Sequence, residues 1–146
     1  MKSKLLSDNG LKVYALVLET GDELVQALTQ FAQDNAIHGA SLTAIGALER
    51  CTIGWLDWEQ KKYIPIPVNE QCEVASLIGD IGQKDGAPAF HVHMVVGTKG
   101  GAAHAGHMLE AWVRPTLEVI VTETPSFLIR SYNRGAHMPL IDLDKN

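Results

Sequence analysis

The chain has 146 residues and a hydrophobic fraction of 46%, which suit a single domain with one core, so we expect one domain over residues 1–146. Its 12 Lys and Arg against 17 Asp and Glu give a formal net charge of -5. This acidic balance disfavours nucleic acid as a partner, because phosphate neutralisation dominates affinity for DNA. The apolar runs are too short for a membrane-spanning helix and the N-terminus lacks a signal-peptide pattern, so we expect a soluble, cytoplasmic protein with no membrane contact.

The first predicted elements are a strand and an amphipathic helix. Lys12 to Leu18 is a predicted strand. The Thr20 hydroxyl and the Glu23 carboxylate, three residues apart, can satisfy each other's backbone N–H groups and so predict a helix start. Apolar residues then follow at helical spacing, which predicts a helix that ends near Asn35 and packs on a sheet. These residues are Leu24, Val25, Leu28, Phe31 and Ala32.

After the helix, short apolar runs separated by turn residues predict strands. The seven runs are Ser41 to Leu48, Cys51 to Asp57, Lys62 to Pro67, Cys72 to Ile81, Ala89 to Val96, Leu117 to Glu123 and Phe127 to Tyr132. An Asp85-Gly86 turn signal predicts a hairpin between the fourth and the fifth run. The pattern indicates an α+β fold, and the absence of strict βαβ alternation argues against a doubly wound parallel sheet.

Four of the six histidines lie between residues 91 and 107. His91 and His93 should share one face of a strand, with Cα atoms roughly 6 to 7 Å apart, so their imidazoles can converge on one ion. The glycines between residues 97 and 101 allow the chain to return, which makes His104 and His107 candidates for a third ligand. Three histidines with an open fourth position form a known zinc arrangement, although imidazole also suits iron, copper and nickel.

Two carboxylates and two further histidines need separate consideration. Glu73 lies on the strand that we expect beside the His91 strand, so it is a candidate catalytic proton acceptor or a hydrogen-bonding partner of a ligand. Glu118 is a second candidate. The alternative for both is a solvated or salt-bridged strand residue. His38 and His137 lie next to turn residues, and we expect loop or interface positions for them.

The remaining patterns favour packing over chemistry. Cys51 and Cys72 form no C-x-x-C pair, so we expect two reduced, packed thiols. No nucleophile elbow, P-loop or dinucleotide-binding fingerprint is present in the sequence. A base-stacking surface is the alternative for four aromatic residues, but the low basic charge favours packing in the core or in a subunit interface. These residues are Trp55, Trp58, Tyr63 and Trp112.

Several motifs occur in a characteristic order: Ala44-Ile45-Gly46-Ala47-Leu48, Cys51-Thr52-Ile53-Gly54, Cys72-Glu73-Val74-Ala75-Ser76-Leu77-Ile78-Gly79-Asp80-Ile81, Phe90-His91-Val92-His93, Ala105-Gly106-His107-Met108-Leu109 and Thr116-Leu117-Glu118-Val119. In this order and spacing the chain resembles the PPC domain, also called DUF296. That family occurs alone in prokaryotes and joined to AT-hook DNA-binding segments in plants. The resemblance implies an α+β fold, mainly antiparallel sheet packed with a few helices, and a homotrimer. It also implies a metal site from His91, His93 and His107, because His107 occupies the family's Gly-His-Leu-Leu-like position.

Three functions remain open. The first is a trimeric metal-binding module, with zinc as the expected metal, that serves assembly or senses a small-molecule ligand. The second is a metal-dependent enzyme acting on a small substrate, with Glu73 moving protons. The third is a DNA-associated regulator, as in the AT-hook relatives. The sequence lacks the Arg-Gly-Arg-Pro core of an AT-hook, and this absence weighs against the third function.

Overall fold

The computed structural model describes residues 1–125 and 127–145. Within these residues it contains one α-helix, α1 (Leu24–Asp34), and a short 3₁₀ turn, η1 (Leu143–Lys145). The strands are β1 (Lys2–Asp8), β2 (Lys12–Glu19), β3 (Ala40–Asp57), β4 (Lys62–Val68), β5 (Cys72–Lys84), β6 (Ala87–Thr98), β7 (Ala103–Glu123), β8 (Arg130–Asn133) and β9 (Met138–Ile141). Neither helical segment in these residues is long and apolar enough to cross a membrane.

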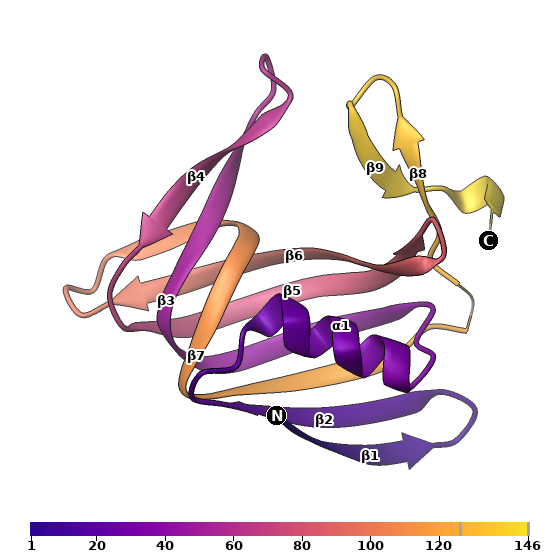
Figure 1. The fold of residues 1–146 in the computed structure, drawn as a ribbon, viewed down its shortest axis with the longest axis horizontal. Coiled ribbons are helices and arrows are strands. Elements are labelled where there is room, and N and C mark those ends of the chain that lie inside the picture. The colour runs from indigo at the N-terminus through magenta and orange to yellow at the C-terminus, as the bar shows by residue number, and fades with distance from the viewer. Residues whose placement is uncertain (126, 146) are drawn as a thin grey trace.

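Strands β1 to β7 form one antiparallel sheet in the order β1-β2-β7-β6-β5-β3-β4. Strand β7 also pairs with β3 along most of its length, so β3, β5, β6 and β7 form a closed circuit of pairings. Strands β8 and β9 form a separate hairpin. Figure 1 shows α1 lying across the sheet, with the β3–β4 and β8–β9 hairpins rising above β6 in the view. The predicted α+β class is therefore confirmed.

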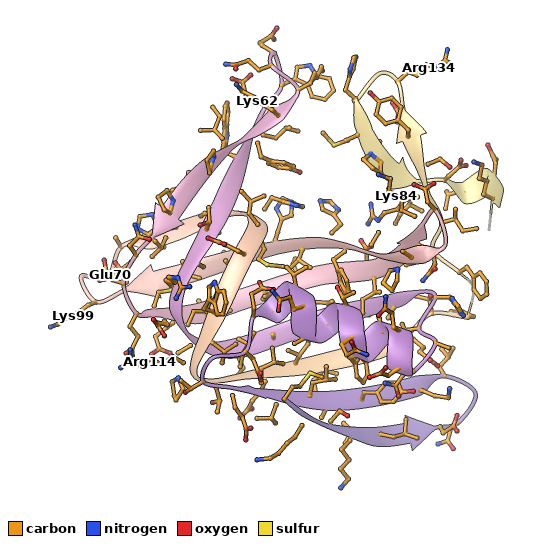
Figure 2. All side chains as sticks on the ribbon, viewed as in Figure 1. Lys62, Glu70, Lys84, Lys99, Arg114 and Arg134 are labelled. Carbon is orange, nitrogen blue, oxygen red and sulfur yellow. The ribbon has the colours of Figure 1, made fainter. Side chains whose placement is uncertain are left out.

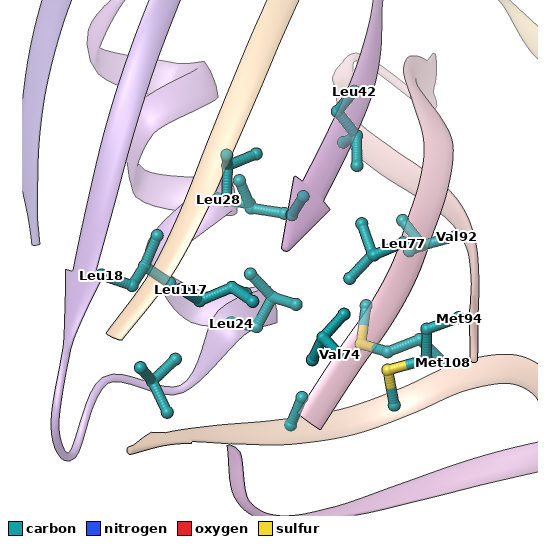
Figure 3. Close-up of a cluster of buried hydrophobic side chains, with 14 of the residues drawn as sticks. Leu18, Leu24, Leu28, Leu42, Val74, Leu77, Val92, Met94, Met108 and Leu117 are labelled. Atoms are coloured by element: carbon teal, nitrogen blue, oxygen red, sulfur yellow. The ribbon is translucent and has the colours of Figure 1, made fainter. Parts of the chain in front are cut away.

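The core lies between α1 and the inward face of the sheet. The apolar stripe of α1 is buried as its spacing predicts. Figure 3 shows the helix residues Leu24 and Leu28 in the same cluster as side chains from β2, β3, β5, β6 and β7. On β6, Val92 and Met94 are 1% and 2% exposed. Because successive strand residues point to opposite faces, the histidines beside them lie on the face away from the core.

The helix ends as predicted but begins differently. Asn35 is the C-terminal cap of α1. Glu23, rather than Thr20, is the N-terminal cap, and its carboxylate accepts a hydrogen bond from the backbone N–H of Gln26. The Thr20 hydroxyl instead donates to the carbonyl oxygen of Pro115 on β7. The predicted Thr20 cap is wrong because a tertiary partner takes its side chain.

Several strands are longer than the sequence predicts. The runs 41–48 and 51–57 form one strand, β3, and the run 117–123 is the last part of β7, which begins at Ala103. Strands β3 and β7 pair with each other along most of their length, so both strands continue through the polar and glycine residues that separate the predicted runs. The pairing register shifts between Gly46 and Leu48, between Leu48 and Arg50, and between Thr52 and Ile53. The predicted strand 127–132 is displaced to β8, and the sequence pattern missed β1 and β9.

Candidate metal centre

Three histidines from two neighbouring strands form a compact triad. His91 and His93 come from β6, and His107 comes from β7. The pairing register places His93 directly opposite His107, so the two side chains share one face of the sheet. The ring centroids are 5.1 Å apart for His91 and His93, 5.3 Å for His91 and His107, and 5.5 Å for His93 and His107.

The triad fits a divalent transition metal such as zinc. One nitrogen from each ring lies within 4.8 Å of the others. Two nitrogens bound to the same zinc ion at ~2.1 Å each are at most ~4.2 Å apart, so small side-chain rotations close the site. The Nδ1 atom of His107 is buried and has no hydrogen-bond partner among the described residues. An unsatisfied buried nitrogen of this kind costs about 1–3 kcal/mol, which an ion bound to the rings would offset.

The surroundings of His91 and His107 favour their neutral imidazoles, the form that metal ligation requires. Burial, followed by the charges of the neighbouring histidines and of the Arg130 guanidinium, lowers the pKa of His107 to about 4. The pKa of His91 is also lowered, first by burial and then by the charge of Arg130. At neutral pH the lone pairs of these two rings are therefore available to a cation.

An aromatic ring and two glycines hold His107 in place. Tyr63 from β4 stacks on the His107 ring, with centroids 4.4 Å apart and an angle of 15° between the planes. Gly54 lies opposite His107 in the β3–β7 pairing, where a Cβ atom would come within 3.0 Å of the Tyr63 ring. A Cβ atom at Gly106 would come within 2.8 Å of the carbonyl oxygen of Gly54. The absence of both side chains therefore allows the strands and the ring to approach this closely.

A cavity of about 190 Å³, which we call the Arg130 cavity, opens beside the triad. His91 and His107 form part of its wall, and Tyr63 from β4 lines it as well. The β8–β9 hairpin contributes Arg130 and three apolar residues, and Lys84 comes from the end of β5. In Figure 2, Lys84 lies near the base of the β8–β9 hairpin. The full lining is Tyr63, Lys84, Ala89, Phe90, His91, His107, Arg130, Met138, Pro139 and Leu140.

Neither carboxylate predicted from the sequence lies at the triad. Glu73 pairs with Gly97, five residues along β5 from Ile78, which faces His93; this separation is roughly 16 Å along a strand. Glu73 lines a different cavity, together with Glu70 and Lys99. Figure 2 shows those two residues at the opposite end of the sheet from Lys84. Glu118 pairs with Ile45 and Val17 on the open face of the sheet.

The other histidines lie outside the triad. His104 pairs with Val96, three residues along β7 from His107, and three is an odd number of steps on a strand. The ring of His38 packs near Phe127, with centroids 4.4 Å apart. His137 has a positive φ of 57° in the β8–β9 turn.

Sequence reasoning missed two contributors to the site. It considered Tyr63 only for packing or base stacking, and it gave Arg130 no role, because nothing in the local pattern indicates that either residue meets the histidines. The Nη2 group of Arg130 donates a hydrogen bond to Asp80, which is opposite His91 in the β5–β6 pairing. This ion pair attaches the β8–β9 hairpin to the sheet beside the triad.

Comparison with known proteins gives one family match and several similar structures. The model of the Plants and Prokaryotes Conserved (PCC) domain matches residues 6–125. A metal-containing protein of Archaeoglobus fulgidus is 28% identical, with a TM-score of 0.83 and 96% of each chain covered. A plant- and prokaryote-conserved (PPC) protein of Pyrococcus horikoshii is 27% identical, with a TM-score of 0.83, and the match covers 97% of this chain and 96% of that one.

Two further matches bear on function only indirectly. A protein of Bacteroides thetaiotaomicron, described provisionally as DNA-binding, is 25% identical with a TM-score of 0.87, and the match covers 97% of this chain and 98% of that one. The Bifunctional protein GlmU of Synechococcus sp. is 28% identical over 121 residues. The match takes in 82% of this chain but only 18% of that protein. The activities of that larger protein are therefore not transferred to this chain.

Proposed function

Because this chain belongs to the Plants and Prokaryotes Conserved domain family, we propose that it is a trimeric metal-binding module whose His91, His93 and His107 hold one zinc ion. The His91–His93–His107 triad carries this proposal, since its three converging imidazoles form a zinc-type donor set and the lowered pKa values of His91 and His107 favour their neutral form. The metal-containing relative from Archaeoglobus fulgidus supports it. When bound, zinc in such a site supplies a Lewis acid with a position open to a small ligand.

The lining of the Arg130 cavity favours a binding or sensor module over a hydrolytic enzyme. No carboxylate is among the described residues that line it. Asp80, which lies opposite His91 in the β5–β6 pairing, is paired with Arg130. An enzyme that moves protons needs a general base within reach of its substrate, and Glu73 lies at the other end of β5.

A metal-dependent enzyme remains the second candidate. The observation that favours it is the cavity itself, because a small molecule inside it would lie directly against two of the three histidines. Turnover of a small substrate by the metal-loaded protein would distinguish this candidate from the module.

Two further features of the proposal rest on composition and packing. The acidic net charge of -5 supports a role other than specific DNA binding. Cys51 and Cys72 are buried, unpaired thiols, which supports residence in a reducing compartment such as the cytoplasm.

Elemental analysis of protein purified without a chelator or a histidine tag tests the metal site. We expect about one zinc ion per chain in the wild-type protein. His91→Ala, His93→Ala and His107→Ala should each lose most of the metal, because two imidazoles hold zinc far more weakly than three. His104→Ala is the matched control and should retain full occupancy. Equal loss from His104→Ala, or full occupancy after His91→Ala, would contradict the proposed ligands.

A further inference from the structure

Arg130 is a buried cation with unused hydrogen-bonding capacity. It is 8% exposed, and its Nη2 group donates to Asp80. Its Nε atom is buried and has no hydrogen-bond partner among the described residues. Buried charged donors are almost always satisfied, because leaving one without a partner is costly. Since Arg130 lines the cavity beside the triad, its positive charge would attract an anionic ligand there.

The charge and shape of the Arg130 cavity define the class of ligand. Among the described residues that line it, the charged ones are Arg130 and Lys84, both positive, and most of the rest of the wall is apolar. Its volume of about 190 Å³ is below the ~300–1,000 Å³ of typical pockets for drug-sized ligands. This size suits a small acid with a short apolar body.

We propose that the Arg130 cavity binds a small organic acid, whose carboxylate Arg130 and Lys84 hold beside the His91–His93–His107 triad. The planar guanidinium matches a carboxylate in geometry and charge, and the Lys84 ammonium adds a second, more exposed cation. The apolar wall formed by Phe90 and Leu140 contacts the body of the acid. This inference rests on the proposed function, because it names the ligand class that the metal-binding module receives.

An NMR titration with butyrate and its neutral analogue butyramide tests the inference on wild-type protein purified without a chelator. The two probes have the same size and shape and differ in charge. We expect saturable binding of butyrate and at least about tenfold weaker binding of butyramide, because only the acid pairs with the buried guanidinium. Equal affinity for the two probes would overturn the inference.

Three variants locate the binding. Lys84→Gln changes an exposed side chain and should weaken butyrate about two- to fivefold, the range of an exposed ion pair. Arg130→Lys keeps a charge for Asp80 but loses the guanidinium geometry, and should weaken butyrate more than about tenfold. Lys99→Gln is the matched control, since Lys99 is an exposed lysine that lines a different cavity, and it should bind butyrate like the wild type.

The outcomes separate this inference from the proposed function. If Arg130→Lys does not fold, Lys84→Gln still decides: wild-type affinity in that variant, or equal weakening by Lys99→Gln, overturns the inference. The metal content of every sample is measured alongside. Metal without preference for butyrate refutes the acid site alone. Preference for butyrate in a wild-type protein that holds no metal refutes the proposed metal function and leaves the acid site standing.

Discussion

His91 and His93 face away from the core because Val92 and Met94 are buried within it. The same alternation places His107 beside them from β7, where its ring lies between the other two histidines and Tyr63. Burial, the two neighbouring histidines and the Arg130 charge make a second proton on His107 unfavourable. The stability of the metal-free protein should therefore depend on pH.

We expect metal-free protein to lose stability as the pH falls from about 6.5 towards 4. His107 has a folded-state pKa of about 4 against the ordinary histidine pKa of 6.5, and the pKa of His91 is lowered as well. The unfolded chain therefore binds protons first in this window, and the free energy of unfolding decreases as the pH falls. Urea unfolding of chelator-treated protein at pH 7 and pH 5 measures this loss.

His107→Gln is the control for this prediction. It removes the titrating group that has the largest shift in the triad, so its stability should fall less between pH 7 and pH 5 than that of the wild type. An identical loss in the two proteins would show that groups other than His107 cause the acid sensitivity.

At the scale of the elements, the site depends on how closely β5, β6 and β7 approach one another. Gly79 lies on β5 opposite Val92, and a Cβ atom there would collide with the carbonyl oxygen of His91 and the Cα atom of Val92. Both contacts are backbone atoms, which cannot move without shifting β6. The close approach that only glycine permits at this position therefore sets the place of His91.

Gly79→Ala should destabilise the protein by about 1–3 kcal/mol, the usual range for overpacking, and should reduce metal occupancy by displacing His91. Gly97→Ala is the matched control on β6, because a Cβ atom there meets nothing within 4 Å. Denaturant unfolding and elemental analysis of both variants test this difference. Normal metal content and stability in Gly79→Ala would contradict the role that we assign to this close approach.

At the scale of the whole molecule, the outward face of the sheet carries an apolar patch formed by Ile45, Ile78 and Ile120. These side chains are 61%, 58% and 41% exposed, and all three line one shallow cavity. Ile78 lies opposite His93 in the β5–β6 pairing, so the patch continues to the edge of the triad. Large exposed aliphatic side chains grouped in this way are typical of protein interfaces, which supports the proposed homotrimer.

Ile78→Glu should convert the proposed trimer to monomers, because a charge at the centre of an apolar interface loses its hydration without gaining a partner. Leu143→Lys is the matched control, since Leu143 is 81% exposed and lies outside the patch. Light scattering at micromolar concentration measures the mass of both variants. A monomeric wild-type protein, or trimeric Ile78→Glu, would contradict the assignment of this face.

The sequence by itself determined the features that follow from local periodicity. The spacing of apolar residues predicts α1, and the alternation of Val92 and Met94 with histidines places His91 and His93 on one outward face. Both patterns are local, because side-chain direction repeats within a few residues along a helix or a strand. The residue pattern alone could not choose between His104 and His107 as the third ligand. The family resemblance favoured His107.

Only the tertiary structure decided which distant residues meet at the site. The β6–β7 register puts His107 opposite His93 and leaves His104 opposite Val96. Docking of the β8–β9 hairpin brings Arg130 to the triad, whereas the length of β5 carries Glu73 away from it. Strand register and hairpin docking depend on contacts between residues far apart in the sequence, and a local pattern contains no information about which of those contacts form.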